Sequence, residues 1–411
     1  GVPPGGIYPA GTLVNLVPLP DAGYCFSGWS GDMERLRESS RLVTQVLMDG
    51  DKSVVANFKP WEAPIGIPAP SFGVTESYRM YDDVGNRNAS LVYIQNSEGG
   101  YYTHYVDSTH PSATDVDNPY GTAATPRQTL PASGDILPGS VVEDHGGPYS
   151  GYQPYNSGTA DMPVFIRGLD QDNMPTFTGD FGLSSPVSYL VLENLDFNGG
   201  EQGWVRISND ASYIAIRGCN FRNGNWISGG TSAVGIGAPA AGTSISNVVV
   251  YANSFHDCGD WEGETDTDFH GVNPNTWGRD ENDNVDLSSV WVVDNHFYHM
   301  SGDAVQVNGG NGTNAYLLTH HIYVGRNVSH ENRQAHYWSK QASDVIMSQN
   351  VAFMNRRHGN QRGDGMGFQY GPDNLWFLFN EIYDCAHGIR QSSTNDFPGR
   401  NAYIIGNVIH D

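Results

Sequence analysis

The sequences VVVYANSF (residues 248–255) and VWVVDNHF (residues 290–297) share a pattern in which a hydrophobic run leads into an asparagine. The pattern returns as HIYVGRNVS, VIMSQNVAF, LWFLFNEI and AYIIGNVI. Two earlier segments, YLVLENLDF and YIAIRGCNF, fit it with Leu195 and Cys219 in place of the asparagine. Repeats at unequal intervals of roughly 20 to 40 residues are typical of stacked β-coils that carry insertions of different length. The sequence therefore predicts an all-β fold, a parallel β-helix.

Alternation of side chains along each repeat predicts which residues face the core. Because successive side chains of a strand point to opposite faces, Val248, Val250 and Phe255 lie on one side, and the same positions of the next repeat are again apolar. The asparagine between them suits a turn, since it tolerates unusual φ angles and can bond backbone groups that the bend frees. We expect six asparagines to stack from coil to coil: Asn253, Asn295, Asn327, Asn350, Asn380 and Asn407.

An apolar stripe is predicted on outward-facing positions, four residues before each asparagine. These positions hold Val249, Trp291, Tyr323, Ile346, Trp376 and Tyr403. Such a stripe exceeds the apolar patch that soluble monomers usually expose. Three interpretations stay open: the stripe is covered by a loop, the linker or the N-terminal residues, it stacks on sugar rings, or it mediates self-association. The candidate sugar-binding residues are Trp291, Tyr323, Trp376 and Tyr403.

A second column, in the strand after the turn, alternates histidine and aspartate. It consists of His270, Asp303, His336, Asp364 and His387. Neighbours ~4.8 Å apart can hydrogen-bond, which raises the pKa of a histidine and lowers that of an aspartate. The column is either an acid–base group that lines a binding site or a ladder that only satisfies turns. Three positions further on, a polar outward row is expected from Asn273, Gln306, Ser339, Gly367 and Arg390.

The composition excludes several function classes. Acidic residues outnumber basic ones by 45 to 21, which gives a formal net charge of -24. This balance argues against nucleic acid as a partner, since its recognition needs a basic surface. No apolar stretch approaches the length of a membrane span. Four cysteines without zinc or redox spacing predict free, mostly buried thiols. Together these features indicate a secreted or cell-surface protein.

The first 59 residues differ from the repeats and form a separate unit. Short strands broken by glycine and proline are expected in GGIYPAGTLVNLVPLPDAGYCFSGWSGD and VLMDGDKSVVANF. Their order resembles the divergent B-repeat modules of bacterial surface and secreted proteins. Residues 60–75, rich in proline, are expected to form a semi-rigid linker, and residues 76–411 the β-helix. Since the chain begins within a module and stops after a strand, we expect a piece of a longer polypeptide, truncated at its C-terminus.

The opening of the predicted β-helix resembles that of secreted proteins of the pectate-lyase-like superfamily. The resemblance is carried by Tyr105 to Asp107, Asp117 to Pro119, Gly121, Thr122 and Gly139 to Val142. It implies a right-handed parallel β-helix. It does not imply one activity, because this fold carries lyases, hydrolases, epimerases, adhesins and phage tailspikes.

Lys340 is the only lysine after residue 59. Its surroundings, SKQASDVIMSQNVAFMN followed by GFQYGPDNLWFLFNEIYD, are similar in layout to the alginate and chondroitin lyases of this superfamily. There a lysine before one coil and an arginine in the next serve β-elimination, which needs a base at the proton α to a uronate carboxylate and a cation or calcium at that carboxylate. Lys340 matches the lysine. Gln369 stands about where the arginine is expected, although Arg357, Arg362 and Arg390 are within reach by an insertion or by a step of one coil.

Alternation along the strand gives a second interpretation of Lys340. It places Lys340 in line with Val307 and Phe368, which are expected to point inward. Either the strand ends before Lys340 or the register slips there. A lysine that only snorkels along the surface is the alternative to a catalytic one.

One acidic loop suggests a calcium site. In GDWEGETDTDFHG every second residue carries a carboxylate: Asp260, Glu262, Glu264, Asp266 and Asp268. Clusters of hard oxygen ligands favour Ca²⁺. Solvated acidic side chains are the alternative interpretation.

Two function classes follow. The first is an extracellular enzyme that cleaves an acidic polysaccharide by β-elimination. Its residues are Lys340, His336, Arg390, Asp303 and Asp364 for catalysis, and Gln306 and Gln369 for substrate binding. The second is a non-catalytic surface protein, an adhesin or a filament subunit. The expected partner is a polysaccharide or another extracellular surface.

Overall fold

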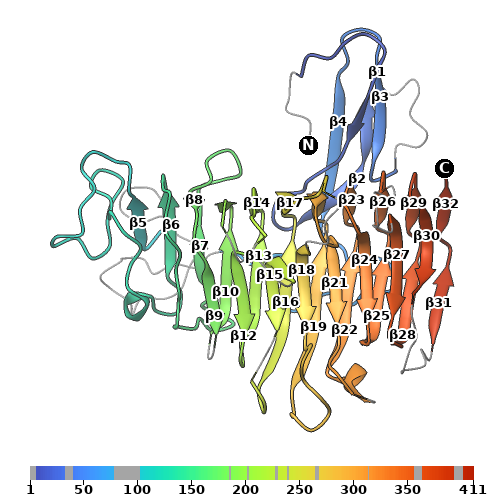
Figure 1. Cartoon of the computed structure of the whole chain (residues 1–411). Coiled ribbons are helices and arrows are strands. Elements are labelled where there is room, and N and C mark those ends of the chain that lie inside the picture. The colour runs from blue at the N-terminus through green and yellow to red at the C-terminus, as the bar shows by residue number, and fades with distance from the viewer. Residues whose placement is uncertain are drawn as a thin grey trace.

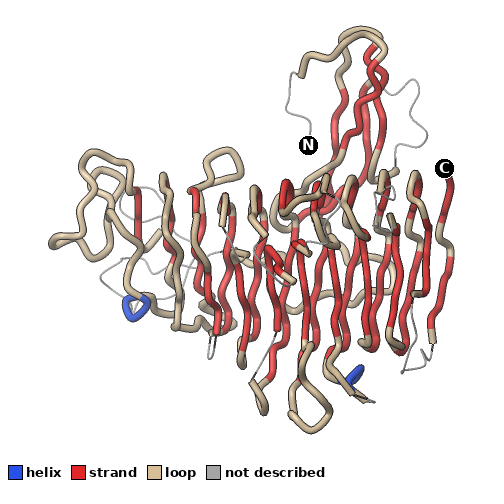
Figure 2. The backbone as a smooth tube through the Cα atoms, viewed as in Figure 1, coloured by secondary structure: helices blue, strands red, loops and turns tan. Residues whose placement is uncertain are grey.

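The computed structural model describes residues 6–32, 40–77, 102–184, 187–200, 203–226, 230–237, 240–263, 268–312, 314–355, 363–392 and 401–411. Figure 1 shows strands stacked along one axis, with a smaller unit projecting from the side of the stack. Nearly all regular structure is strand (Figure 2). The helices among the described residues are two short 3-10 turns, η1 (Ser133–Asp135) and η2 (Ala315–Leu317). No helix in this part of the chain is long and apolar enough to cross a membrane.

Three parallel sheets run along this axis and form the predicted right-handed parallel β-helix. The 11-stranded sheet consists of β5 (His104–Asp107), β6 (Val141–His145), β7 (Val164–Arg167), β10 (Ser188–Glu193), β13 (Ser212–Arg217), β16 (Ser244–Tyr251), β19 (Asp286–Val293), β22 (Thr319–Gly325), β25 (Ser343–Ser348), β28 (Asp373–Leu378) and β31 (Ala402–Ile405). The 9-stranded sheet consists of β8 (Thr176–Phe177), β11 (Asp196–Asn198), β14 (Asn220–Arg222), β17 (Ser254–Cys258), β20 (His296–Met300), β23 (Val328–His330), β26 (Val351–Phe353), β29 (Glu381–Tyr383) and β32 (Val408–His410). The 8-stranded sheet consists of β9 (Phe181–Ser184), β12 (Val205–Ser208), β15 (Thr231–Gly237), β18 (Phe269–Asn275), β21 (Val305–Asn308), β24 (Ala335–Lys340), β27 (Asp364–Gln369) and β30 (His387–Gln391).

Apolar side chains fill one continuous core between the three sheets. Val248, Val250 and Phe255 are fully buried, as alternation predicts. Phenylalanines of successive coils stack, with ring centroids 4.7 Å apart between Phe221 and Phe255 and again between Phe255 and Phe297. This distance is the spacing of neighbouring strands. Burial of each such side chain contributes roughly 1.5–3 kcal/mol, so the stacked core holds the coils together.

The predicted asparagine ladder is confirmed. Asn295 Oδ1 accepts hydrogen bonds from the backbone N–H of Asn253 at 2.9 Å and from its Nδ2 at 3.0 Å. Asn295 Nδ2 donates to the Val250 carbonyl at 2.9 Å. The same arrangement repeats as far as Asn407. The asparagines thereby satisfy backbone groups that the bend between two sheets leaves without a strand partner.

The N-terminal module is a pair of two-stranded antiparallel sheets seated on the β-helix. The pairs are β1 (Thr12–Leu16) with β3 (Thr44–Met48), and β2 (Tyr24–Gly31) with β4 (Val54–Pro60). Val43 forms one apolar cluster with Val328 and Phe353 on the outer face of the 9-stranded sheet. The Arg41 guanidinium lies 2.7 Å from the Glu381 carboxylate. These contacts hold the module against the coils.

The linker that follows the module crosses the outer face of the 11-stranded sheet. Its side chains Ile67, Phe72 and Val74 are buried in one cluster with the apolar stripe. The indole Nε1 of Trp291 donates to the Pro68 carbonyl at 2.8 Å. The linker is therefore fastened to the sheet by apolar packing and by a hydrogen bond.

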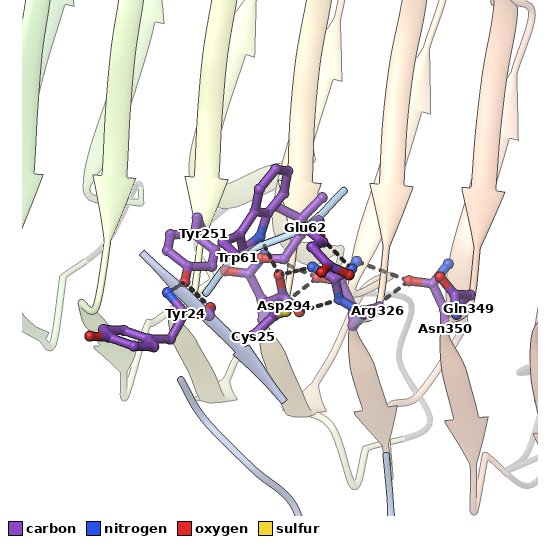
Figure 3. A network of polar contacts seen from close by, with 12 residues as sticks. Tyr24, Cys25, Trp61, Glu62, Tyr251, Asp294, Arg326, Gln349 and Asn350 are labelled. Atoms are coloured by element: carbon purple, nitrogen blue, oxygen red, sulfur yellow. Dashed lines mark hydrogen bonds and ion pairs between the residues drawn. The ribbon is translucent and has the colours of Figure 1, made fainter. Parts of the chain in front are cut away.

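A polar network fixes the beginning of the linker (Figure 3). The Arg326 guanidinium contacts both oxygens of Asp294, at 2.7 and 2.8 Å. Asp294 also accepts the Nε1–H of Trp61 at 2.9 Å. The Tyr251 hydroxyl accepts the N–H of Tyr24 at 3.1 Å. The network joins the module, the linker and three coils of the helix.

The predicted free thiols are confirmed. Cys25, Cys219 and Cys258 are buried and Cys385 is half-buried, and none of the four forms a disulfide. Burial raises the pKa of the Cys219, Cys258 and Cys385 thiols to about 12. These three thiols therefore stay protonated and unreactive at neutral pH.

Candidate functional site

The apolar stripe is in the predicted register, but its middle is not accessible. The stripe pairs coil by coil through Val249, Trp291, Tyr323, Ile346, Trp376 and Tyr403. Trp291 and Tyr323 are only 6% and 7% exposed beneath the linker, so neither offers a ring face to a sugar. Their expected sugar-binding role is replaced by packing. Trp376 and Tyr403 stack with centroids 3.9 Å apart, and Tyr403 stays accessible.

The outer face of the 8-stranded sheet departs from the predicted His–Asp column at one coil. The register of β24 places Ala335 opposite Asp364, and the same register carried to β21 places Ala335 in line with Asp303. The predicted alignment of His336 is therefore wrong by one residue. A slip of one residue moves a side chain to the opposite face of its strand.

His336 faces the interior instead. Its ring is fully buried, and Nδ1 lies 2.7 Å from Ser329 Oγ and 3.1 Å from Asn332 Nδ2. Burial lowers the pKa of His336 to about 3, so the imidazole is neutral at physiological pH. The catalytic role expected of His336 is excluded by this position, and the ring fastens a turn.

Lys340 faces outward, contrary to the inward alignment expected from alternation. It pairs with Asn308 of β21 and with Gln369 of β27, and Asn275 of β18 extends the same row. The Nζ of Lys340 donates to Gln306 Oε1 at 3.2 Å. The row thus sets one ammonium group among uncharged amides.

A chain of hydrogen bonds leads from this row into the protein. Gln306 Oε1 also accepts from Asn308 Nδ2 at 2.9 Å, and Gln306 Nε2 donates to Asp303 Oδ2 at 2.5 Å. The N–H of Asp303 donates to His270 Nδ1 at 2.9 Å, so this nitrogen carries no proton. Burial raises the pKa of Asp303 to about 7 and lowers that of His270 to about 3. Asp303 therefore titrates near neutral pH, whereas His270 stays uncharged.

Arg390, two coils beyond the lysine, forms an ion pair with Asp364 of the intervening coil. Arg390 Nη2 lies 2.5 Å from Asp364 Oδ2, and His387 Nδ1 lies 2.9 Å from the other oxygen. The guanidinium carbon is 5.4 Å from the Trp338 ring centroid, within cation–π range. Trp338 Nε1 in turn donates to Gln369 Oε1 at 3.1 Å. Arg390 is thus held in one orientation and partly neutralised.

The polar row expected three positions after the His–Asp column contains Trp338 where Ser339 was expected. Gln306 pairs with Trp338, Trp338 with Gly367, and Gly367 with Arg390. Ser339 is fully buried on the opposite face of the strand. The same one-residue shift that turns His336 inward explains this difference.

The calcium site expected in the acidic loop stays a prediction, because Glu264 and Asp266 lie outside the described residues. The Asp268 carboxylate lies 3.7 Å from the buried Arg333 guanidinium and accepts a hydrogen bond from the Gln334 side chain. No group of three or more histidine, cysteine or carboxylate side chains within the described residues is placed to hold a metal. Outside the described residues lie Glu264, Asp266, Arg357 and Arg362.

Sequence reasoning missed Asn275 and Asn308, the amides beside the lysine. A signal was present, because Asn275, Asn308 and Gln369 each lie five residues after the histidine or aspartate of their coil. Lys340 joins them once Ala335 takes the column position in its own coil. Only the register of the sheet shows that Ala335, and not His336, occupies the column position.

Residues 2–62 match a family described as the Divergent InlB B-repeat domain. No curated protein sequence matches the chain. Similar solved structures include the pectate lyase Pel9A, at 11% identity over 72% of this chain and 78% of that chain with a TM-score of 0.43. An alginate lyase from Paenibacillus sp. is 15% identical over 68% and 94%, with a TM-score of 0.45. PfbA, a surface adhesin of Streptococcus pneumoniae, is 15% identical over 71% and 70%, with a TM-score of 0.38. Likeness at such identities concerns the fold alone. The chain therefore joins a module of the B-repeat family to a right-handed parallel β-helix.

Proposed function

We propose that the protein acts outside the cell on an acidic polysaccharide and cleaves it by β-elimination at the outer face of the 8-stranded sheet. The observation that carries the proposal is the outward position of Lys340 in a row with Asn275, Asn308 and Gln369. Amide N–H groups bind carboxylate and hydroxyl oxygens without bringing charge, and an amine can exchange a proton. These are the two kinds of group that the elimination requires.

A single residue, Lys340, serves first as the proton acceptor and then as the proton donor of the reaction. Neutral Lys340 takes the proton from the carbon α to a uronate carboxylate. The electron pair left on that carbon forms a carbon–carbon double bond, and the bond to the glycosidic oxygen breaks. The Lys340 ammonium then returns the proton to the leaving oxygen. The N–H groups of Asn308 and Gln369 stabilise the charge that develops on the carboxylate meanwhile.

Gln306 and Asp303 position the lysine. The Gln306 amide cannot rotate without losing its bond to Asp303, so its Oε1 stays directed at Lys340. Asp303 carries a negative charge behind Gln306 when it is deprotonated, and that charge disappears when Asp303 is protonated. Activity is therefore expected to depend on pH around 7, where Asp303 titrates.

Arg390 serves a neighbouring sugar rather than the reacting one. Its strand lies two coils from β24, or ~10 Å along the axis at the usual strand spacing. Its planar guanidinium suits a second uronate carboxylate. We assign carboxylate recognition to these side chains.

Binding without cleavage is the second candidate function. Gln369 stands where the resemblance to lyases expects an arginine, and its Oε1 is engaged by Trp338. Arg390, the nearest described arginine on this face, is paired with Asp364. A face with one proton-transferring group and several amides would suit an adhesin that holds a polysaccharide.

The deciding experiment measures ultraviolet absorbance of unsaturated product over alginate, pectate, chondroitin and other uronate polymers, with calcium and with chelator. Wild type is compared with Lys340→Ala and with Lys59→Ala, a matched control that removes an exposed lysine of the module. Loss of product with Lys340→Ala alone supports the lyase. Absence of product from wild type on every polymer, together with retained binding, leaves the adhesin.

A further inference from the structure

An exposed tryptophan stands beside the Lys340 row and has no part in the core. Trp277 follows β18 and is 52% exposed. Its backbone is held firmly, because its N–H donates to Asn275 Oδ1 at 2.6 Å, and Arg279 N–H donates to the Thr276 carbonyl at 3.0 Å. Gly278 supplies the φ of +87° that this tight turn requires. The turn therefore presents the indole at a fixed place.

Tyr370 stands on the other side of the same row. It directly follows Gln369, the last residue of β27, and its ring centroid lies 6.4 Å from that of Trp277, at an interplanar angle of 39°. The two residues belong to strands separated by β21 and β24. Three strand spacings amount to ~14 Å between their backbones. The two side chains must therefore lean toward each other across the ends of the intervening strands.

Those ends carry the proposed reaction site. The ladder of hydrogen bonds continues past the strands, from Thr276 N–H to the Asn308 carbonyl at 3.1 Å and from Gly309 N–H to the Lys340 carbonyl at 2.7 Å. The rings thus converge next to Asn308 and Lys340. An apolar surface at this place borders the only ammonium group of the sheet's described face.

We propose that Trp277 and Tyr370 form an aromatic platform that stacks against a pyranose ring of a polysaccharide bound beside Lys340. The inference rests on the proposed function for the identity of the ligand. Aromatic rings bury a large area at small entropic cost, and the indole N–H and phenol O–H remain for sugar hydroxyls. The platform recognises the flat face of a sugar, whereas Lys340 and the amides recognise its carboxylate.

Because the platform recognises ring shape and the Lys340 row recognises charge, the platform contributes to substrate specificity independently of charge. Sugars whose axial hydroxyl interrupts the flat face would stack poorly, whatever their charge. Neutral and acidic oligosaccharides with the same ring shape would both use the platform. Trp277 and Tyr370 are positioning residues in this scheme, since neither exchanges a proton with substrate.

The test measures oligosaccharide binding by titration calorimetry in the Lys340→Ala background, where no turnover interferes. The probes are oligomers of the polymer that wild type cleaves, or that it binds if no polymer is cleaved. Trp277→Ala is expected to raise Kd about tenfold, whereas Trp277→Phe recovers most of the affinity. Tyr155→Ala is the matched control, because Tyr155 is 54% exposed and lies in the segment between β6 and β7. In an active wild type, Trp277→Ala raises KM more than it lowers kcat.

The outcomes separate the platform from the lyase. Weaker binding by Trp277→Ala in a protein without lyase activity keeps the platform and removes the lyase. Unchanged Kd and KM in Trp277→Ala, with activity still dependent on Lys340, overturns the platform alone. Equal losses in Trp277→Ala and Tyr155→Ala, or no binding of any polymer, also overturn it.

Discussion

Along the 11-stranded sheet the outward row holds Trp291 and Tyr323, whereas along the 8-stranded sheet it holds Asn308, Lys340 and Gln369. Both rows arise from the same alternation in the same coils. The apolar row is covered by the linker, and the polar row carries the candidate site. A repeated outward position in a β-helix therefore has no fixed role, because the side chains of the row decide whether it is covered by another segment or binds a ligand.

The largest loss of protein stability is expected from a substitution on the covered face of the 11-stranded sheet. Trp291→Ala removes an indole that packs under the linker and bonds the Pro68 carbonyl. We expect the free energy of unfolding to fall by about 4 kcal/mol, the usual cost of deleting a buried tryptophan. Urea denaturation followed by circular dichroism measures it. Polysaccharide binding per folded molecule should not change, and a selective loss of binding would restore the sugar-stacking interpretation of the stripe.

The polar network beneath the linker is the next test of that face. Asp294→Asn leaves the largely buried Arg326 without its counter-charge. We expect a loss of about 3 kcal/mol, as for other broken buried pairs. Combining it with Arg326→Met should recover part of the loss, and a double-mutant cycle from denaturation curves gives the coupling. Additive effects of the two substitutions would contradict a role of this pair in holding the linker.

The two faces of β24 give a third comparison, between inward His336 and outward Lys340. Burial holds the pKa of His336 at about 3, below its unfolded value near 6.5. The folded state therefore binds fewer protons than the unfolded one between these values, and the associated stability is complete above pH 6.5 and is lost as pH falls toward 3. At pH 5 the wild type should have lost about 2 kcal/mol relative to pH 7.5 through this residue.

His336→Gln tests that assignment. Glutamine has no ionisation to lose, so the stability difference between wild type and variant should shrink by about 2 kcal/mol from pH 7.5 to pH 5. Denaturation curves of both proteins at the two pH values provide the comparison. A difference that is independent of pH would show that His336 is not buried as a neutral ring.

The smallest effect on stability is expected at the polar face. Lys340→Ala removes one hydrogen bond from a half-buried ammonium, so the free energy of unfolding should change by about 0.5–1 kcal/mol at most. Thermal unfolding of wild type, Lys340→Ala and Lys59→Ala measures this change beside the activity assay. A loss as large as that of Trp291→Ala would make Lys340 a structural residue and would remove the contrast between the faces.

The sequence alone determined the coils, the core and the asparagine ladder. Val250, Phe255 and Asn253 follow from local alternation, because a side chain two residues along a strand returns to the same face. Their repetition from coil to coil fixes the stacking. The B-repeat module was evident for a similar reason, since its turn residues occur in a recognisable order.

Tertiary structure decided which outward residues meet. Whether His336 or Ala335 continues the column depends on hydrogen bonds between strands of different coils, and a shift of one residue reverses every side chain of the strand. The covering of Trp291 and the meeting of Trp277 with Tyr370 depend on how distant segments fold back. Local periodicity constrains neighbours along the chain, and only packing in three dimensions sets the contacts between segments that the chain keeps far apart.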